Sequence, residues 1–380
     1  MSEPLPDPDR APGAPHPRET LHLFGQARAE AEFLAAHSGG RMHHAWLIAG
    51  PRGVGKATLA WRIARFLLAL PQDSGGLFGG AAPPPPDSLD TDPDHPVVRR
   101  ILAQAEPRLF LLRRGANATG SGLAANILVD EVRKLKSFLQ LSAADGGRRA
   151  VIVDAADEMN TPAANALLKL LEEPPAGVTF LLVSHQPMRL LPTIRSRCRT
   201  LRLDMLGPAE MARALEQTGV AAAPDEAPAL AALSGGSVGA AVRLVELQGL
   251  DLYGQIVALL GGLPRMDRPR AIALAEGCAG KANAETFELM LDLIDLALSR
   301  LARAGAAGGI DPEAAPDEAR IFARLSPDTA AARGWANLQQ ELSARSRHGR
   351  AVNLDPAALV LDMFLAIAAA SGAASRRTPA

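Results

Sequence analysis

Short apolar runs alternate with amphipathic stretches in the first half of the chain. Four runs have the length and composition of strands: 45–49, 109–112, 150–153 and 178–183, and those at 45–49 and 150–153 are predicted to be buried. Helical patterns separate them, over residues 21–37, 57–70, 130–141 and 165–173. Strands that alternate with helices predict a parallel sheet covered by helices.

The pattern changes after about residue 203, where no further strand is predicted. Residues 206–247 have the pattern of a small helical bundle with a Gly-Gly turn, and residues 248–372 are helical in pattern and rich in Ala and Leu. The chain therefore predicts an α/β domain over residues 20–205 and helical domains after it.

Three segments lack a pattern that could form a packed core. Residues 1–19 and 373–380 are predicted to be disordered tails, because they offer little apolar surface to offset the entropy of ordering. Residues 71–96 contain two Gly pairs and a run of four prolines, which predict a flexible insertion.

Composition limits the classes of function. The formal net charge of -1 leaves no general basic field, so contact with nucleic acid has to be local or made through partners. The two cysteines, Cys198 and Cys278, provide neither a disulfide framework nor a four-ligand zinc site and indicate a cytoplasmic protein. The apolar run 357–370 is shorter than the roughly 20 residues of a membrane span and contains Asp362.

A glycine-rich segment lies between the first predicted strand and the helix that follows. It reads Gly50, Pro51, Arg52, Gly53, Val54, Gly55, Lys56, Ala57, Thr58. Such a loop wraps backbone N–H groups around phosphate oxygens at a helix N-terminus, and its lysine reaches the terminal phosphates. A Ser or Thr after the lysine normally ligates magnesium, but here Ala57 occupies that position and Thr58 is one residue late. The sequence therefore leaves two interpretations open: a loop that binds ATP or ADP, and a relic loop that binds no nucleotide.

A carboxylate ends the strand over residues 150–153. Asp154 is suited to organising magnesium. Ala155 stands where a working ATPase with this kind of phosphate loop has the glutamate that activates water. Losing such a base typically costs about 10²- to 10⁴-fold in rate. Asp157 and Glu158 are predicted to be solvated residues at a helix start.

Three blocks carry a family resemblance, and they span about residues 20–205: 43–51 with the loop that follows, 165–175 (NALLKLLEEPP), and Ser196-Arg197-Cys198. In this order they resemble the AAA+ subunits of bacterial DNA polymerase III clamp loaders. The resemblance implies an α/β AAA+ P-loop domain, a helical lid over 206–247 and an all-α C-terminal collar over 248–372. It also implies a hetero-pentamer with gamma/tau and delta subunits that acts on a sliding clamp and primed DNA.

Within that family the resemblance favours a subunit that does not hydrolyse ATP. Ala57, Ala155 and Gly239, the last at the sensor-2 arginine position, replace three parts of the hydrolytic machinery. Arg197 is retained, and the resemblance implies that it reaches the γ-phosphate held by a neighbouring subunit as an arginine finger in trans. No catalytic residue is expected in cis, and Cys198 is expected to be packed rather than reactive. Many relatives carry a four-cysteine zinc module after the phosphate loop, but residues 71–96 contain no cysteine, so no zinc or other metal site is predicted.

Two alternatives remain open. An active gamma/tau-like ATPase with a shifted site predicts appreciable turnover by the chain alone, abolished by Lys56→Ala. An unrelated P-loop enzyme such as a small-molecule kinase lacks a segment for the acceptor and leaves Ser196-Arg197-Cys198 unexplained. A surface ion pair is the simplest other role for Arg197.

Overall fold

The computed structural model describes residues 7–10, 13–40, 42–71, 86–117, 119–141 and 147–375. The chain forms two compact units. One comprises Met1–Leu206 with Ser237–Gly239, and the other comprises Gly207–Gly236 with Ala240–Ala380. Most of the predicted insertion, 72–85, and the last five residues of the predicted C-terminal tail lie outside the described residues.

A five-stranded parallel sheet forms the centre of the N-terminal unit. Its order is β2-β3-β4-β1-β5. The strands are β1 (Ala45–Ala49), β2 (Leu109–Leu112), β3 (Arg149–Val153), β4 (Val178–Ser184) and β5 (Arg199–Arg202). The first four match the predicted runs. The fifth was not predicted, because only Leu201 of this edge strand is buried and the segment has no apolar run.

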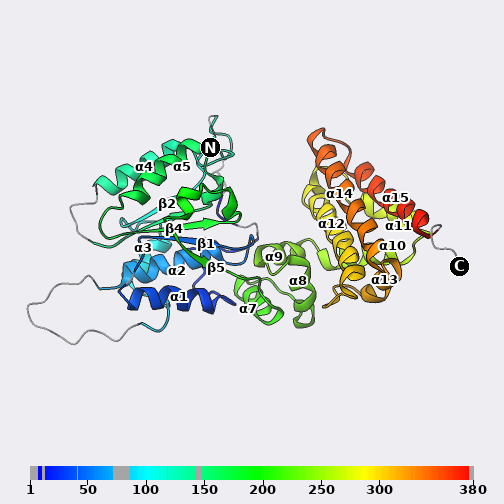
Figure 1. Cartoon of the computed structure of the whole chain (residues 1–380), viewed down its shortest axis with the longest axis horizontal. Coiled ribbons are helices and arrows are strands. Elements are labelled where there is room, and N and C mark those ends of the chain that lie inside the picture. The colour runs from blue at the N-terminus through cyan, green and yellow to red at the C-terminus, as the bar shows by residue number, and fades with distance from the viewer. Residues whose placement is uncertain are drawn as a thin grey trace, which may run out of the picture. The chain divides into compact units, whose positions relative to one another are not determined.

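Helices cover both faces of this sheet (Figure 1). On one face lie α4 (Val129–Leu141) and α5 (Thr161–Glu172). On the other lie α1 (Ala27–Ser38), α2 (Lys56–Ala69) and α3 (Pro96–Leu102). On the α4–α5 face, apolar side chains of the sheet such as Leu47 and Val151 form one core with Leu135 and Leu167. The sheet and its helical layers agree with the predicted α/β class.

The predicted boundaries of two helices need correction. The helical pattern over 21–37 becomes a helix only at Ala27, because Gly25 adopts φ = +72°, which a helix cannot contain. Helix α5 starts earlier than expected, at Thr161, because the Asn160 side chain accepts a hydrogen bond from Ala163 N at 2.9 Å and caps it.

The described part of the predicted N-terminal tail is packed against the N-terminal unit. Arg65 of α2 is buried and donates to the carbonyl oxygens of Arg18 and Thr20, both at 2.8 Å. His16 is fully buried, faces Asp9 and meets Trp61 edge-on. Residues 7–10 and 13–19 therefore do not form the expected disordered tail: Arg65 binds the Arg18 carbonyl group, and the buried pair of His16 and Asp9 links the segment's two described parts.

The C-terminal unit is helical. It contains α7 (Pro208–Thr218), α8 (Ala227–Ser234), most of α9 (Val238–Glu246), α10 (Gly249–Gly261), α11 (Arg268–Glu276), α12 (Ala284–Ala307), α13 (Glu318–Leu325), α14 (Thr329–Ala351) and α15 (Pro356–Ser375). In the core of this unit Arg300 forms an ion pair with Glu318, which also accepts from the Tyr253 hydroxyl. The division into lid and collar stays a prediction, because both segments fall in this unit.

No single helix in the described part of the chain is long and apolar enough to span a membrane, although α8 and α9 together pass such a test as a bent pair.

Candidate functional site

The phosphate loop connects the buried strand β1 to α2, as the sequence predicts. Gly53 and Gly55 have φ of +79° and +97°, values that other residues rarely adopt. A Cβ atom on Gly53 would lie 2.0 Å from Ser237 Oγ, and one on Gly55 would lie 2.5 Å from Leu23 Cδ1. The loop is therefore held between the segment before α1 and the segment before α9, and only glycine fits at both positions.

Lys56 is turned back onto its own loop. Its ammonium donates to Gly50 O at 2.8 Å and to Pro51 O, and the residue is 2% exposed. Burial, with a smaller contribution from Arg52, lowers the pKa of Lys56 to about 8, and the nearby carboxylates only partly oppose this. A phosphate group would have to take the lysine from these two carbonyl oxygens.

Asp154 stands directly after β3 at the carboxyl edge of the sheet. It is 8% exposed, and burial raises the pKa of its carboxyl group to about 7. Repulsion from Asp9, Glu158 and Asp157 adds to this rise, while the Lys56 ammonium opposes it. Ala155, the next residue, is buried and brings no base to the site.

The neighbouring acids have structural partners. Asp157 accepts from the backbone N–H groups of His185 and Gln186, at 3.0 and 3.2 Å, and so fixes the loop after β4. Glu158 forms an ion pair with Arg114 at 2.9 Å. Both residues stand at a helix start, as predicted, but they are half-buried and paired rather than solvated. They follow Ala155 in a short 3-10 helix, Ala156–Glu158, and neither is free to replace the missing glutamate.

The residues present fit phosphate better than they fit a metal ion. The backbone cradle and Lys56 suit phosphate oxygens. Ala57 has no hydroxyl for magnesium, and Asp154 is buried with a raised pKa. Among the described residues no cluster of three or more His, Cys, Asp or Glu side chains could hold a metal ion.

The predicted sensor-2 segment does reach the loop. Val238 N donates to Gly53 O at 3.0 Å, and Ser237 lies against Gly53. Gly239 follows and has no side chain to offer a phosphate. The structure thus brings together Lys56, Asp154 and the segment around Gly239 at one end of the sheet.

The N-terminal segment also contributes to this edge of the sheet, which the sequence did not predict. Arg113, directly after β2, forms ion pairs with Asp7 and Asp9. The charge of Asp9 contributes to the raised pKa of Asp154. The charged residues in 7–19 were the only signal in the sequence for this packing. Their partners lie about 50 to 100 residues further along the chain, so spacing could not identify them.

Arg197 lies at the amino ends of the strands, whereas the phosphate loop lies at their carboxyl ends. It precedes β5 by two residues, whereas the loop directly follows β1, and in the parallel register Arg202 pairs with Ala49. Gly50 is level with Leu203 in this register, so Arg197 and Gly50 are separated by about six residues along the strand direction, or at most about 20 Å. The Arg197 guanidinium pairs with Glu172 at 2.8 Å, and 36% of the side chain is exposed. It is therefore directed at neither Lys56 nor Asp154.

The residues beside Arg197 have structural roles. Ser196 Oγ donates to Thr193 O at 3.1 Å. Cys198 packs against the core, and burial raises the pKa of its thiol to about 12, so the thiolate is scarce at neutral pH. This agrees with the prediction of a packed cysteine.

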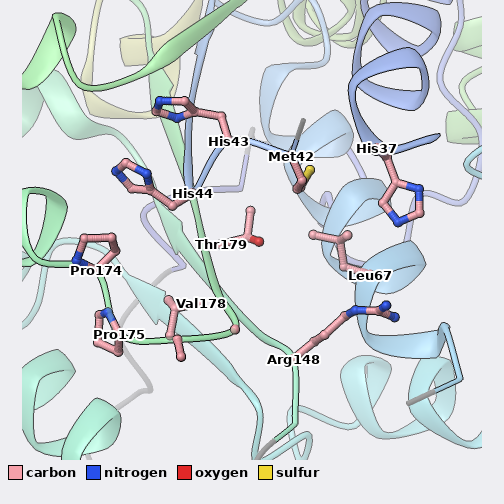
Figure 2. Close-up of a pocket in the computed structure, with 12 residues that line it drawn as sticks. His37, Met42, His43, His44, Leu67, Arg148, Pro174, Pro175, Val178 and Thr179 are labelled. Carbon is pink, nitrogen blue, oxygen red and sulfur yellow. The ribbon is translucent and has the colours of Figure 1, made fainter. Parts of the chain in front are cut away.

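A cavity of about 490 Å³ also opens at the amino edge of the sheet, near β1 and β4 (Figure 2). His37, His43, His44 and Arg148 contribute its polar groups. The rings of His43 and His44 stack with centroids 4.5 Å apart, and His44 Nε2 lies 3.0 Å from Leu171 O. Burial lowers the pKa of His37 and of His44. This cavity is separate from the phosphate loop, which leaves the sheet at its other edge.

A parallel sheet ordered 5-1-4-3-2, with a phosphate loop after β1 and an aspartate after β3, defines the N-terminal unit as an AAA+ P-loop domain. Residues 25–207, about half of the chain, match the model of the family described as DNA polymerase III, delta subunit. Over these residues the chain is similar to that family.

Individual relatives agree with this assignment. The chain is 39% identical over 222 residues to DNA polymerase III subunit delta' of Pseudomonas aeruginosa, with 56% of this chain and 59% of that protein covered. It is 33% identical over 215 residues to the delta' subunit of Escherichia coli, with 57% and 58% covered. The gamma/tau subunit of Mycobacterium tuberculosis is 30% identical over 231 residues, with 58% and 35% covered. The matches span less than two thirds of the length of these relatives.

Among solved structures, a DNA polymerase III gamma subunit-related protein from Thermotoga maritima is 16% identical, with a TM-score of 0.39 and 88% and 97% of the two chains covered.

Proposed function

We propose that this chain is the delta' subunit of a bacterial DNA polymerase III clamp loader. In this role it stands in a hetero-pentamer with gamma/tau and delta subunits and helps to load the sliding clamp on primed DNA. It does not hydrolyse ATP itself. It supplies Arg197 to the ATP site of the adjacent motor subunit, and its location is cytoplasmic.

The placement of Arg197 is the observation that carries this proposal. A cationic side chain about a third exposed lies at the sheet edge away from its own phosphate loop. A finger at that edge serves a nucleotide held by another subunit. An arginine supplied in trans stabilises the charge of the transition state and is worth about 10³- to 10⁵-fold in well-studied NTPases.

The condition of the chain's own site supports the same proposal. Lys56 is bonded to the loop carbonyls, Ala155 is buried where a base would stand, and Asp154 has a raised pKa. Nucleotide binding remains compatible with the glycine cradle, and we propose that any ATP or ADP held there has a structural role. These features disfavour the alternative of an active gamma/tau-like motor.

Reconstitution with the gamma/tau and delta subunits of the same organism tests the proposal. We expect Arg197→Ala to leave the complex assembled and to slow single-turnover hydrolysis at the adjacent motor site at least about 100-fold. Arg195→Ala removes an equal charge from the same segment and serves as the control, since its guanidinium bonds to Met188 instead. Normal hydrolysis by the Arg197→Ala complex would contradict the role in trans.

A further inference from the structure

The guanidinium of Arg197 is held at both of its terminal nitrogens. One nitrogen, Nη2, lies 2.8 Å from Oε1 of Glu172, the last residue of α5. The other, Nη1, donates to the carbonyl oxygen of Thr193 in α6 (Pro192–Arg195) at 3.0 Å. The side chain is therefore oriented by a carboxylate from one helix and a carbonyl group from another.

The two helices that hold the guanidinium are fixed to the same core. Ile194 of α6 is fully buried, and Leu171 of α5 is 1% exposed in the same apolar cluster. Glu172 directly follows Leu171, and Arg197 comes three residues after Ile194. The carboxylate and the guanidinium are thus carried by backbone that has little freedom to move apart.

The pair leaves part of the guanidinium available to another ligand. A guanidinium has five N–H donors in a fixed planar fork, and the two contacts engage only its two ends. With 36% of the Arg197 side chain exposed, the remaining donors have access to phosphate oxygens from outside the chain. An arginine that is already ordered loses less rotamer freedom when it meets its target than a free surface arginine does.

We propose that Glu172 is a positioning residue for Arg197. It holds the guanidinium in the orientation from which the fork meets the γ-phosphate of the neighbouring motor, and it does not touch the nucleotide itself. This inference rests on the proposed function. It explains why the carboxylate at the end of α5 is directed at the finger rather than at solvent alone.

Glu173 offers a matched control. It has the same side chain one residue later, it is exposed, and no hydrogen bond or ion pair of its carboxylate is found in the described part of the chain. A change at Glu173 alters the local charge by the same amount without releasing Arg197.

The test compares reconstituted complexes that carry Glu172→Gln, Glu173→Gln, Arg197→Ala, or Glu172→Gln with Arg197→Ala. Single-turnover hydrolysis is measured against ATP concentration, so that the rate constant and the half-saturating concentration are obtained separately. We expect Glu172→Gln to lower the rate constant about 3- to 30-fold while the half-saturating ATP concentration changes less than twofold. Glu173→Gln should behave as the wild type, and in the Arg197→Ala background Glu172→Gln should cause no further loss.

Two results for Glu172→Gln would overturn the positioning role. A rate constant at or above the wild-type value for Glu172→Gln overturns the inference, because it means that the carboxylate is dispensable or competes with the phosphate for the finger. A further loss in the Arg197→Ala background overturns it too, since Glu172 then acts independently of Arg197. If Arg197→Ala itself has no effect, the proposed function fails. If Arg197→Ala slows hydrolysis and Glu172→Gln does not, only the positioning role fails.

Discussion

The buried carboxyl group of Asp154 gives a prediction that needs only the isolated chain. Burial raises its pKa from an ordinary 3.8 to about 7 in the folded chain. The folded chain therefore keeps a proton that the unfolded chain releases. As a consequence, Asp154 destabilises the fold increasingly as the pH rises from about 4 to about 7, and by a constant amount above that range.

The size of the effect follows from the difference between the two pKa values. At about 1.4 kcal/mol for each pKa unit, the destabilisation at pH 8 is at most about 4 kcal/mol. At pH 5 the same linkage gives about 1.5 kcal/mol. The neutral variant Asp154→Asn removes this dependence, so its gain in unfolding free energy over the wild type should be about 2 to 3 kcal/mol larger at pH 8 than at pH 5.

Urea unfolding at the two pH values measures this gain. Trp46 and Trp61 are buried in the N-terminal unit and Trp335 in the C-terminal unit, so all chains carry Trp335→Phe and the remaining tryptophan fluorescence reports on the unit that contains Asp154. Asp87→Asn, at an exposed position of the same unit, is the control and should change stability little at either pH. A gain for Asp154→Asn that does not depend on pH would refute the reasoning, as would a variant less stable than the wild type at pH 8.

Three further outcomes are expected. In the proposed role the chain's own loop does not hydrolyse ATP, so Lys56→Ala in this subunit should leave ATP turnover of the reconstituted complex within about twofold of the wild type. A large loss in a turnover assay would favour the motor alternative. Gly53→Ala should lower the unfolding free energy by about 2 kcal/mol or more in a urea titration, because its Cβ would meet Ser237. Gly120 is also at positive φ but has open space around it, so Gly120→Ala should lower the unfolding free energy by only about 1 kcal/mol. Glu318→Gln should lower the unfolding free energy of the C-terminal unit by about 3 to 5 kcal/mol in calorimetry, because it leaves the Arg300 guanidinium buried without its counter-charge.

The sheet could be predicted where its strands are buried on both faces. β1, β3 and β4 are buried along their whole length, and each consists mostly of apolar residues, with Arg149 in β3 and Thr179 and Ser184 in β4 as the exceptions. β5 escaped prediction because three of its four residues are exposed, so its position depends on pairing with β1 rather than on its own pattern.

The chemistry of the site was predictable only where a motif fixes the backbone. The loop from Gly50 to Lys56 lies where its spacing indicates. The partners of its lysine, two carbonyl oxygens of the same loop, could not be read from spacing. The acids at 157 and 158 were misread as solvated for a similar reason, since their partners lie on other strands and loops. The packing of residues 13–19 involves Arg65 of α2 and the contact of His16 with Trp61, which the composition of the tail does not reveal.

The central claim is that the chain contributes a catalytic arginine to a neighbour but does not hydrolyse ATP. The most direct test compares single-turnover hydrolysis by the purified chain, by the complex reconstituted with gamma/tau and delta, and by that complex with Arg197→Ala. Our account predicts background hydrolysis by the chain alone, efficient hydrolysis by the complex, and loss of the phase that belongs to the adjacent motor site when Arg197 is removed. Appreciable turnover by the chain alone, or an unchanged time course for the Arg197→Ala complex, would contradict it.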